Sequence, residues 1–132
     1  MIKIDNLTSS LETLKIGFAS FEKYRGSDIS DMLADSCVKR FEYTLETAIK
    51  LIKKFLKQIY SIDEKDLTIN NTFRLMEGYG FINSWEKWKD YYAKRNDTSH
   101  EYNLSRKLLE IIPSFIEDAE HLISNLSKEE NE

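Results

Sequence analysis

Glycine and proline are scarce in this chain of 132 residues, which contains four Gly and one Pro. Because these two residues mark most turns, their scarcity favours a small number of long helices. Apolar residues make up 41% of the chain, which is enough for a packed core, so the composition argues against intrinsic disorder. The length suits one domain, which we place at residues 1–132 with a frayed, charged tail from about residue 127.

Cysteine is nearly absent too, because Cys37 is the single one and cannot form an intramolecular disulfide. We expect Cys37 in or near the core of a protein of the reducing cytoplasm. The two histidines, His100 and His121, lie far apart, and no Cys/His cluster has the spacing of metal ligands. We therefore expect no metal and no cofactor, and we place His121 on the surface without a metal role.

Long hydrophobic runs are missing as well. No run of 18 apolar residues occurs, and the first ten residues are mixed and polar, so the sequence predicts no membrane span and no signal peptide. A basic excess is also lacking: 19 basic side chains stand against 23 acidic ones, a net charge of −4. Any contact with RNA would have to be local, or built by two subunits together. We interpret the lysines of "KLIKKFLK" as a solvated helix surface.

Apolar residues three and four positions apart predict four long helices and one short one. The first stripe holds Ile4, Leu7, Leu11, Leu14, Phe18 and Phe21. A capping box at Ser9 and Glu12 would move the start of this helix a turn later, and Gly26 is a stop signal. The second helix is predicted from about Asp31 to Tyr60. Its stripe holds Ala34, Val38, Phe41, Leu45, Ala48, Ile52, Phe55 and Ile59.

The second half of the chain predicts the remaining helices. "NTFRLMEGYGF" indicates a short helix ended by Gly78 or Gly80. "NSWEKWKDYYAKR" indicates the third long helix, with Ser84 or Asn83 as its N-cap. Its stripe holds Phe81, Trp85, Trp88 and Tyr92, and Arg95 is the next position on it. We interpret both tryptophans as core or interface rather than as a base-stacking platform.

The last helix is predicted from about Leu104 to Leu126, with a stripe of Leu109, Ile112, Ile116, Ala119, Ile123 and Leu126. Pro113 lies inside it and predicts either a kink or a later first turn. Stripes this regular suit near-parallel packing. The sequence therefore predicts an all-α fold, an up-and-down four-helix bundle with an extra short helix.

The segment "RNDTSHEY" concentrates groups that can do chemistry, namely Arg95, Asn96, His100 and Tyr102. An arginine fork suits phosphate oxygens, and a histidine can take and give protons near neutral pH. With a ribose 2′-hydroxyl, these two groups suffice for RNA cleavage without a metal. The alternative is a plain helix end, in which the arginine complements the helix dipole and Tyr102 packs.

Geometry limits the chemical interpretation. On one continuous helix Arg95 and His100 would point about 140° apart, because five residues turn about 500°. Two arrangements avoid this. A capping box from Thr98 to Glu101 would break the helix before His100. Alternatively, a two-fold dimer would bring Arg95 of one chain beside His100 of the other.

Three segments together resemble a known family. "RNDTSHEY" matches an R-x4-H-x-Y motif, "VKRFEYTLETAIKLIKKFLK" is similar to the family's second helix, and "LMEGYGFINSWEKWKDYYAKRN" is similar to its third. The chain thus resembles the HEPN-domain proteins that pair with minimal nucleotidyltransferases, often labelled nucleotidyltransferase substrate-binding proteins. The resemblance covers nearly the whole chain.

This resemblance implies a helical homodimer that acts as a metal-independent RNase toxin on RNA, with tRNA as the first candidate substrate. Arg95, His100 and, by position, Asn96 would line a composite cleft at the dimer interface. The cognate nucleotidyltransferase would be the antitoxin and would transfer AMP from ATP to Tyr102. That modification would add bulk and negative charge beside the arginine and the histidine.

Two other functions stay open. The chain would otherwise be a non-catalytic subunit that completes the substrate site of a nucleotidyltransferase, or a helical dimer without chemistry. In the segment "RFEY" we expect Phe41 in the core and Tyr43 at a dimer surface. Arg40 and Glu42 are either a surface pair or a support for the cleft.

Overall fold

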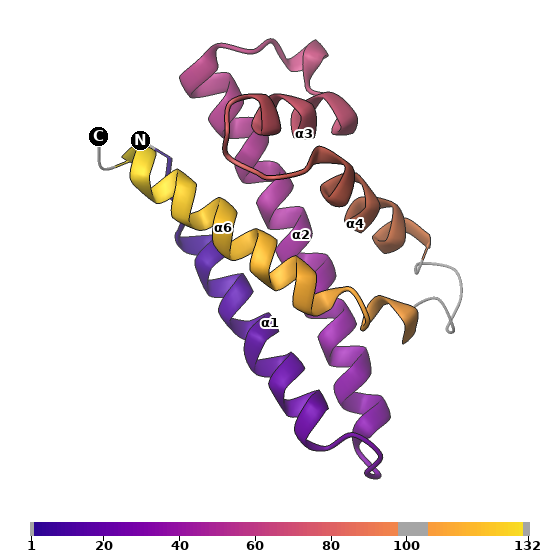
Figure 1. Cartoon of the computed structure of the whole chain (residues 1–132). Coiled ribbons are helices and arrows are strands. Elements are labelled where there is room, and N and C mark those ends of the chain that lie inside the picture. Colours follow the sequence, from indigo (N-terminus) through magenta and orange to yellow (C-terminus); the bar gives the residue numbers. More distant parts are fainter. Residues whose placement is uncertain (1, 98–105, 131–132) are drawn as a thin grey trace.

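The first two helices lie side by side and antiparallel, as Figure 1 shows. The computed structural model describes residues 2–97 and 106–130. Helix α1 spans Asp5–Lys23 and helix α2 spans Ser30–Tyr60. The turn between them contains Gly26 with a φ of 83°, so this glycine ends α1 as predicted. The capping box at Ser9 was wrong, because α1 already begins after Ile4 and thereby buries Leu7.

The predicted stripe of α2 forms the centre of the core. All of its members are buried except Ile59, which is 45% exposed because the last turn of α2 extends beyond the packed helices. Phe41 is fully buried and meets Phe115 edge to face, with ring centroids 4.9 Å apart. Its predicted packing role is therefore confirmed. Cys37 is also buried, as predicted.

A short region joins α2 to the next long helix. After a 3-10 turn, η1 (Glu64–Asp66), helix α3 spans Ile69–Gly78 and is capped by the Thr68 hydroxyl, which accepts from the Asn71 N–H at 3.3 Å. Gly80 follows with a φ of 85°. Helix α4 then spans Trp85–Asp97. Both α3 and α4 pack along α2 (Figure 1).

The last long helix, α6, spans Ile112–Glu130 and packs on α1 (Figure 1). Residues 106–108 are helical, but a turn at 109–111 separates them from α6. Pro113 is thus in the first turn of α6, where a missing N–H costs nothing. Of the two outcomes that we predicted for this proline, the later start is the one found.

That later start shifts the buried face of α6. The predicted stripe members Ile116 and Ile123 are only partly buried, and Phe115 and Leu122 are buried in their place. The described part is all-helical, with four long helices and the short α3, so the predicted fold class is confirmed. None of its helices is both long and apolar enough to cross a lipid bilayer.

Candidate functional site

Helix α4 carries two residues of the predicted site, Arg95 and Asn96, and its start is fixed by two side chains. The Ser84 hydroxyl accepts from the Lys87 N–H at 3.2 Å, so Ser84 is the cap that the sequence offered. The Glu77 carboxylate accepts from the Trp85 N–H at 3.1 Å. A carboxylate at this end also complements the helix dipole. These bonds set where α4 begins.

Aromatic packing holds the middle of α4 against the core. Trp88 is 1% exposed and contacts the rings of Phe73, Tyr91 and Phe115, with centroids 5.7 to 5.9 Å away. Its interpretation as core is therefore confirmed. Trp85 is partly exposed, and the Arg74 guanidinium lies 4.3 Å above its ring centroid.

A polar cluster ties α4 to α6 beside these rings. The Tyr91 hydroxyl donates to Asp118 and lies 2.9 Å from the Ser114 hydroxyl, while the Lys87 ammonium lies 3.0 Å from the same Asp118 carboxylate. Burial raises the pKa of Tyr91, and the bond to Asp118 raises it further. We had expected Tyr92 on the buried stripe, but Tyr91 is buried and Tyr92 is half-buried. Tyr91 is the buried tyrosine because its hydroxyl bonds to Ser114 and Asp118 on α6, which are 23 and 27 residues away in the sequence.

Arg95 lies two turns after Trp88 and so faces α2. Its guanidinium is in an ion pair with Glu46, and its Nε lies 3.8 Å from the Glu42 carboxylate. The arginine side chain is 28% exposed. Glu42 and Glu46 are one helical turn apart on α2, so both face α4. Of the two roles weighed for Glu42, support of the arginine is the one that the structure shows.

A pocket of about 290 Å³ opens where α2 and α4 meet. Arg95 and Asn96 line it from α4, and Glu46, Lys50 and Lys53 line it from α2. Three cationic side chains therefore meet a single carboxylate among these five residues. Such a lining favours an anionic ligand.

The structure brings together only part of the predicted site. Arg95 and Asn96 lie in the pocket between α2 and α4. His100 and Tyr102 lie outside the described residues, as does the capping box predicted from Thr98 to Glu101. The roles predicted for His100 and Tyr102, and those predicted for Arg95 and Asn96, stay predictions.

Sequence reasoning missed Glu46 and the two lysines beside it. We had placed the lysines on a solvated surface; Lys50 is exposed and Lys53 is half-buried, and both line the pocket. The spacing of Glu42 and Glu46, four residues apart, was a usable sign of a paired basic partner. This spacing could not identify Arg95 as the partner, because Arg95 is 49 residues beyond Glu46 in the sequence.

Other residues weighed from the sequence have structural roles. The Arg40 guanidinium donates to the Thr13 carbonyl of α1 at 2.7 Å, so Arg40 does not pair with Glu42. His121 is half-buried rather than fully at the surface, and its Nε2 lies 3.1 Å from the Asn125 amide. Within residues 2–97 and 106–130, no three His, Cys, Asp or Glu side chains gather as a metal site would require.

Comparison with known proteins establishes the family of the chain. Residues 2–128 match the family described as nucleotidyltransferase substrate binding protein like. The chain belongs to this family. The match spans the helices described above except the last two residues of α6, so it covers both the core and the pocket between α2 and α4.

Two solved structures share the fold. One, from Haemophilus influenzae, is described as revealing the fold of a substrate binding domain of a nucleotidyltransferase; it has a TM-score of 0.83 at 21% identity, over 95% of this chain and 99% of its own. A Thermus thermophilus structure has a TM-score of 0.67 at 21% identity, over 86% of this chain and 98% of its own. At these identities the likeness concerns the fold alone.

A curated relative is also similar in sequence. It is a Haemophilus influenzae protein named "Probable ribonuclease HepT", 29% identical over 84 residues. The match covers 62% of this chain and 58% of that relative's length.

Proposed function

We propose that this chain is the RNase toxin of a cytoplasmic toxin–antitoxin pair with a minimal nucleotidyltransferase. The observation that carries the proposal is the position of Arg95, at the end of α4 in a pocket that Lys50 and Lys53 also line. A guanidinium among ammonium groups suits the phosphate of a polynucleotide. The family to which the chain belongs and the ribonuclease name of its relative support this function.

The proposed reaction is an internal transesterification of RNA. The imidazole of His100 takes the proton of a ribose 2′-hydroxyl, and the 2′-oxygen bonds to the adjacent phosphorus. The bond from phosphorus to the 5′-oxygen breaks, and that oxygen receives a proton. Arg95 stabilises the extra negative charge on the phosphorane, and the Asn96 amide orients the phosphate or the imidazole. The products are a 2′,3′-cyclic phosphate and a free 5′-hydroxyl.

Dimerisation completes the proposed site. On a continuous helix Arg95 and His100 would diverge by about 140°, which is too far apart for one phosphate. A two-fold dimer solves this by combining Arg95 of one subunit with His100 of the other. The proposal therefore includes a homodimer with its cleft at the ends of the two α4 helices.

The nucleotidyltransferase would silence this site by modification. The hydroxyl of Tyr102 attacks the α-phosphorus of ATP, AMP is transferred to the tyrosine, and pyrophosphate leaves. The new phosphodiester carries a negative charge two residues from His100, so it both blocks and repels an RNA phosphate.

A second function, a non-catalytic substrate-binding subunit of the nucleotidyltransferase, is favoured by one observation. Glu42 and Glu46 already contact the guanidinium of Arg95, so any RNA phosphate has to compete with two carboxylates. In that case the chain would bind its partner enzyme stably and cut no RNA. Substitution of His100 would then leave bacterial growth unchanged.

Cleavage of end-labelled total tRNA in EDTA separates the two functions. The purified chain is compared with His100→Ala and Arg95→Ala, and with Arg25→Ala as a control at an exposed arginine of the α1–α2 turn. We expect the parent and the control to cut, and the other two variants to be inactive at unchanged circular dichroism. Parent protein that mass spectrometry shows to be free of AMP, and that still cuts no RNA, would refute the toxin function.

A further inference from the structure

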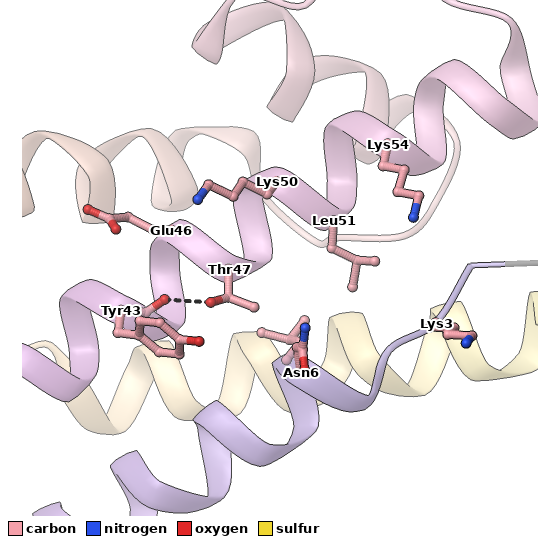
Figure 2. A pocket seen from close by; sticks show the side chains of 9 residues that line it. Lys3, Asn6, Tyr43, Glu46, Thr47, Lys50, Leu51 and Lys54 are labelled. Carbon is pink, nitrogen blue, oxygen red and sulfur yellow. Dashed lines mark hydrogen bonds between the residues drawn. The ribbon is translucent and has the colours of Figure 1, made fainter.

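A second pocket, of about 300 Å³, lies on the side of α2 that faces the start of α1. Figure 2 shows that its basic side chains come from two elements: Lys3 from the segment before α1, and Lys50 and Lys54 from α2. We call this pocket the lysine groove. The family comparison assigns nothing to it.

Charge distinguishes the lysine groove from the rest of the surface. Its three lysines meet one carboxylate, that of Glu46, in a chain with a net charge of −4. Some lysines elsewhere are in ion pairs, as Lys57 is with Glu64 and Lys87 is with Asp118. Among the ion pairs of the described residues, none involves a lysine of the groove. Local positive charge is thus concentrated here.

The remaining lining suits a nucleotide. The amide of Asn6 can donate to phosphate or sugar oxygens, as can ammonium groups. Tyr43 is 60% exposed and lines the groove, and its backbone carbonyl accepts from the Thr47 hydroxyl at 2.8 Å. The role inferred here needs this ring free, so it replaces our expectation that Tyr43 lies at a dimer surface. An exposed tyrosine ring is a surface on which an unpaired base stacks.

The groove is continuous with the candidate active site. Glu46 and Lys50 line both the lysine groove and the pocket that holds Arg95. Along α2, Lys50, Lys53 and Lys54 are spaced by three residues and one, so basic groups extend from Arg95 to the start of α1. A single strand can follow this path with its backbone on the lysines.

We propose that the lysine groove binds the sugar–phosphate backbone of single-stranded RNA next to the scissile phosphate. Lys3, Lys50 and Lys54 neutralise successive phosphates, and Tyr43 stacks on one base. A single strand fits because its unstacked bases are free to reach an aromatic ring, which those of a duplex are not. The position next to a scissile phosphate rests on the proposed RNase function, but RNA binding by the groove does not require cleavage.

Fluorescence anisotropy with a labelled 20-nucleotide oligouridylate tests the groove. The full-length chain carries His100→Ala so that RNA stays intact, and EDTA is present. The groove variant is Lys3→Gln/Lys50→Gln/Lys54→Gln, and the control is Lys39→Gln/Lys65→Gln/Lys107→Gln, which removes the same charge from exposed lysines outside both pockets. Matched melting temperatures establish that both fold.

We expect the groove variant to bind RNA at least about tenfold more weakly than the control, with a salt dependence shallower by a slope of about 2 for three lost contacts. Tyr43→Ala should weaken binding by about tenfold with an unchanged salt slope. Equal affinity of the groove and control variants would overturn the proposal and would leave the groove to an acidic surface of a protein partner.

Cleavage assays separate this inference from the proposed function. With His100 restored, the double variant Lys3→Gln/Lys54→Gln, which keeps both lysines of the Arg95 pocket, should cut RNA with a higher KM and an unchanged kcat. RNA binding that depends on the groove in a chain that never cuts would retain the groove and refute the RNase. A chain that cuts RNA equally well with and without the groove lysines would support the RNase function and refute the role of the groove.

Discussion

Replacing Glu46 by glutamine tests how the arginine of α4 is held. Glu46 pairs with Arg95 across α2 and α4, and it is the carboxylate shared by the two basic pockets. Glutamine keeps the size and the hydrogen-bonding oxygen but removes the charge. Because the charge repels an incoming phosphate, we expect Glu46→Gln to bind RNA more tightly than the parent.

The magnitude follows from the exposure of the pair. The side chain of Glu46 is 47% exposed, so its field is screened nearly as in water. Two unit charges about 4 Å apart interact by about 1 kcal/mol at the dielectric constant of water. Loss of that repulsion lowers the Kd for RNA about fivefold, since about 1.4 kcal/mol corresponds to a factor of ten. The gain should shrink at high salt.

Stability should change little, because an exposed ion pair contributes at most about 1 kcal/mol. The matched control is Glu22→Gln, since Glu22 is also 47% exposed and also pairs with an arginine, Arg25. Anisotropy of a 20-nucleotide RNA at low salt measures the Kd of each variant. Weaker binding by Glu46→Gln than by Glu22→Gln would show that Glu46 positions Arg95 for RNA, contrary to the competition argued here.

Two further predictions concern the core. Tyr91→Phe should lower the free energy of unfolding by about 1–2 kcal/mol, because Asp118 loses a donor, whereas Tyr24→Phe at the surface should not; equal melting temperatures would contradict this. Burial raises the pKa of the Cys37 thiol to about 11 from 9.0, so at pH 8 iodoacetamide should react about 100-fold more slowly than in urea. Because the Cys37 thiol binds its proton more tightly in the folded state than in the unfolded state, the protonated thiol adds to the free energy of unfolding. This contribution is fully present below pH 9 and is lost as the pH rises through 11. Urea unfolding at pH 8 and 10 should show the loss in the parent and a smaller one in Cys37→Ala.

The helices themselves were predictable because their apolar spacing is local information. The stripe from Ala34 to Phe55 is buried as predicted, since α2 contacts the other helices along most of its length. The start of α6 was not fixed by spacing, because Pro113 fits both a kink and a first turn. In the helix that begins at Ile112, Phe115 and Leu122 are buried together with the predicted Ile112, Ala119 and Leu126.

The candidate site was only half predictable for a related reason. The sequence placed Arg95 on the stripe of α4, and the structure has it facing α2. Its carboxylate partners depend on where α4 lies against α2, and α4 is held in place by the burial of Trp88 and by the bond from Tyr91 to Asp118. Such contacts join residues far apart in the chain, so no local pattern contains them.

The distribution of charge explains how an acidic chain can suit RNA. The net charge of −4 argues against binding only if the charges are evenly spread. Here Glu46 divides two pockets whose other charged side chains are all basic, namely Lys3, Lys50, Lys53, Lys54 and Arg95. A strand that lies along α2 meets these cations in sequence, and Glu46 together with Glu42 sets how strongly Arg95 is held before RNA arrives. Affinity for RNA should therefore follow the charge along α2 and not the net charge of the protein.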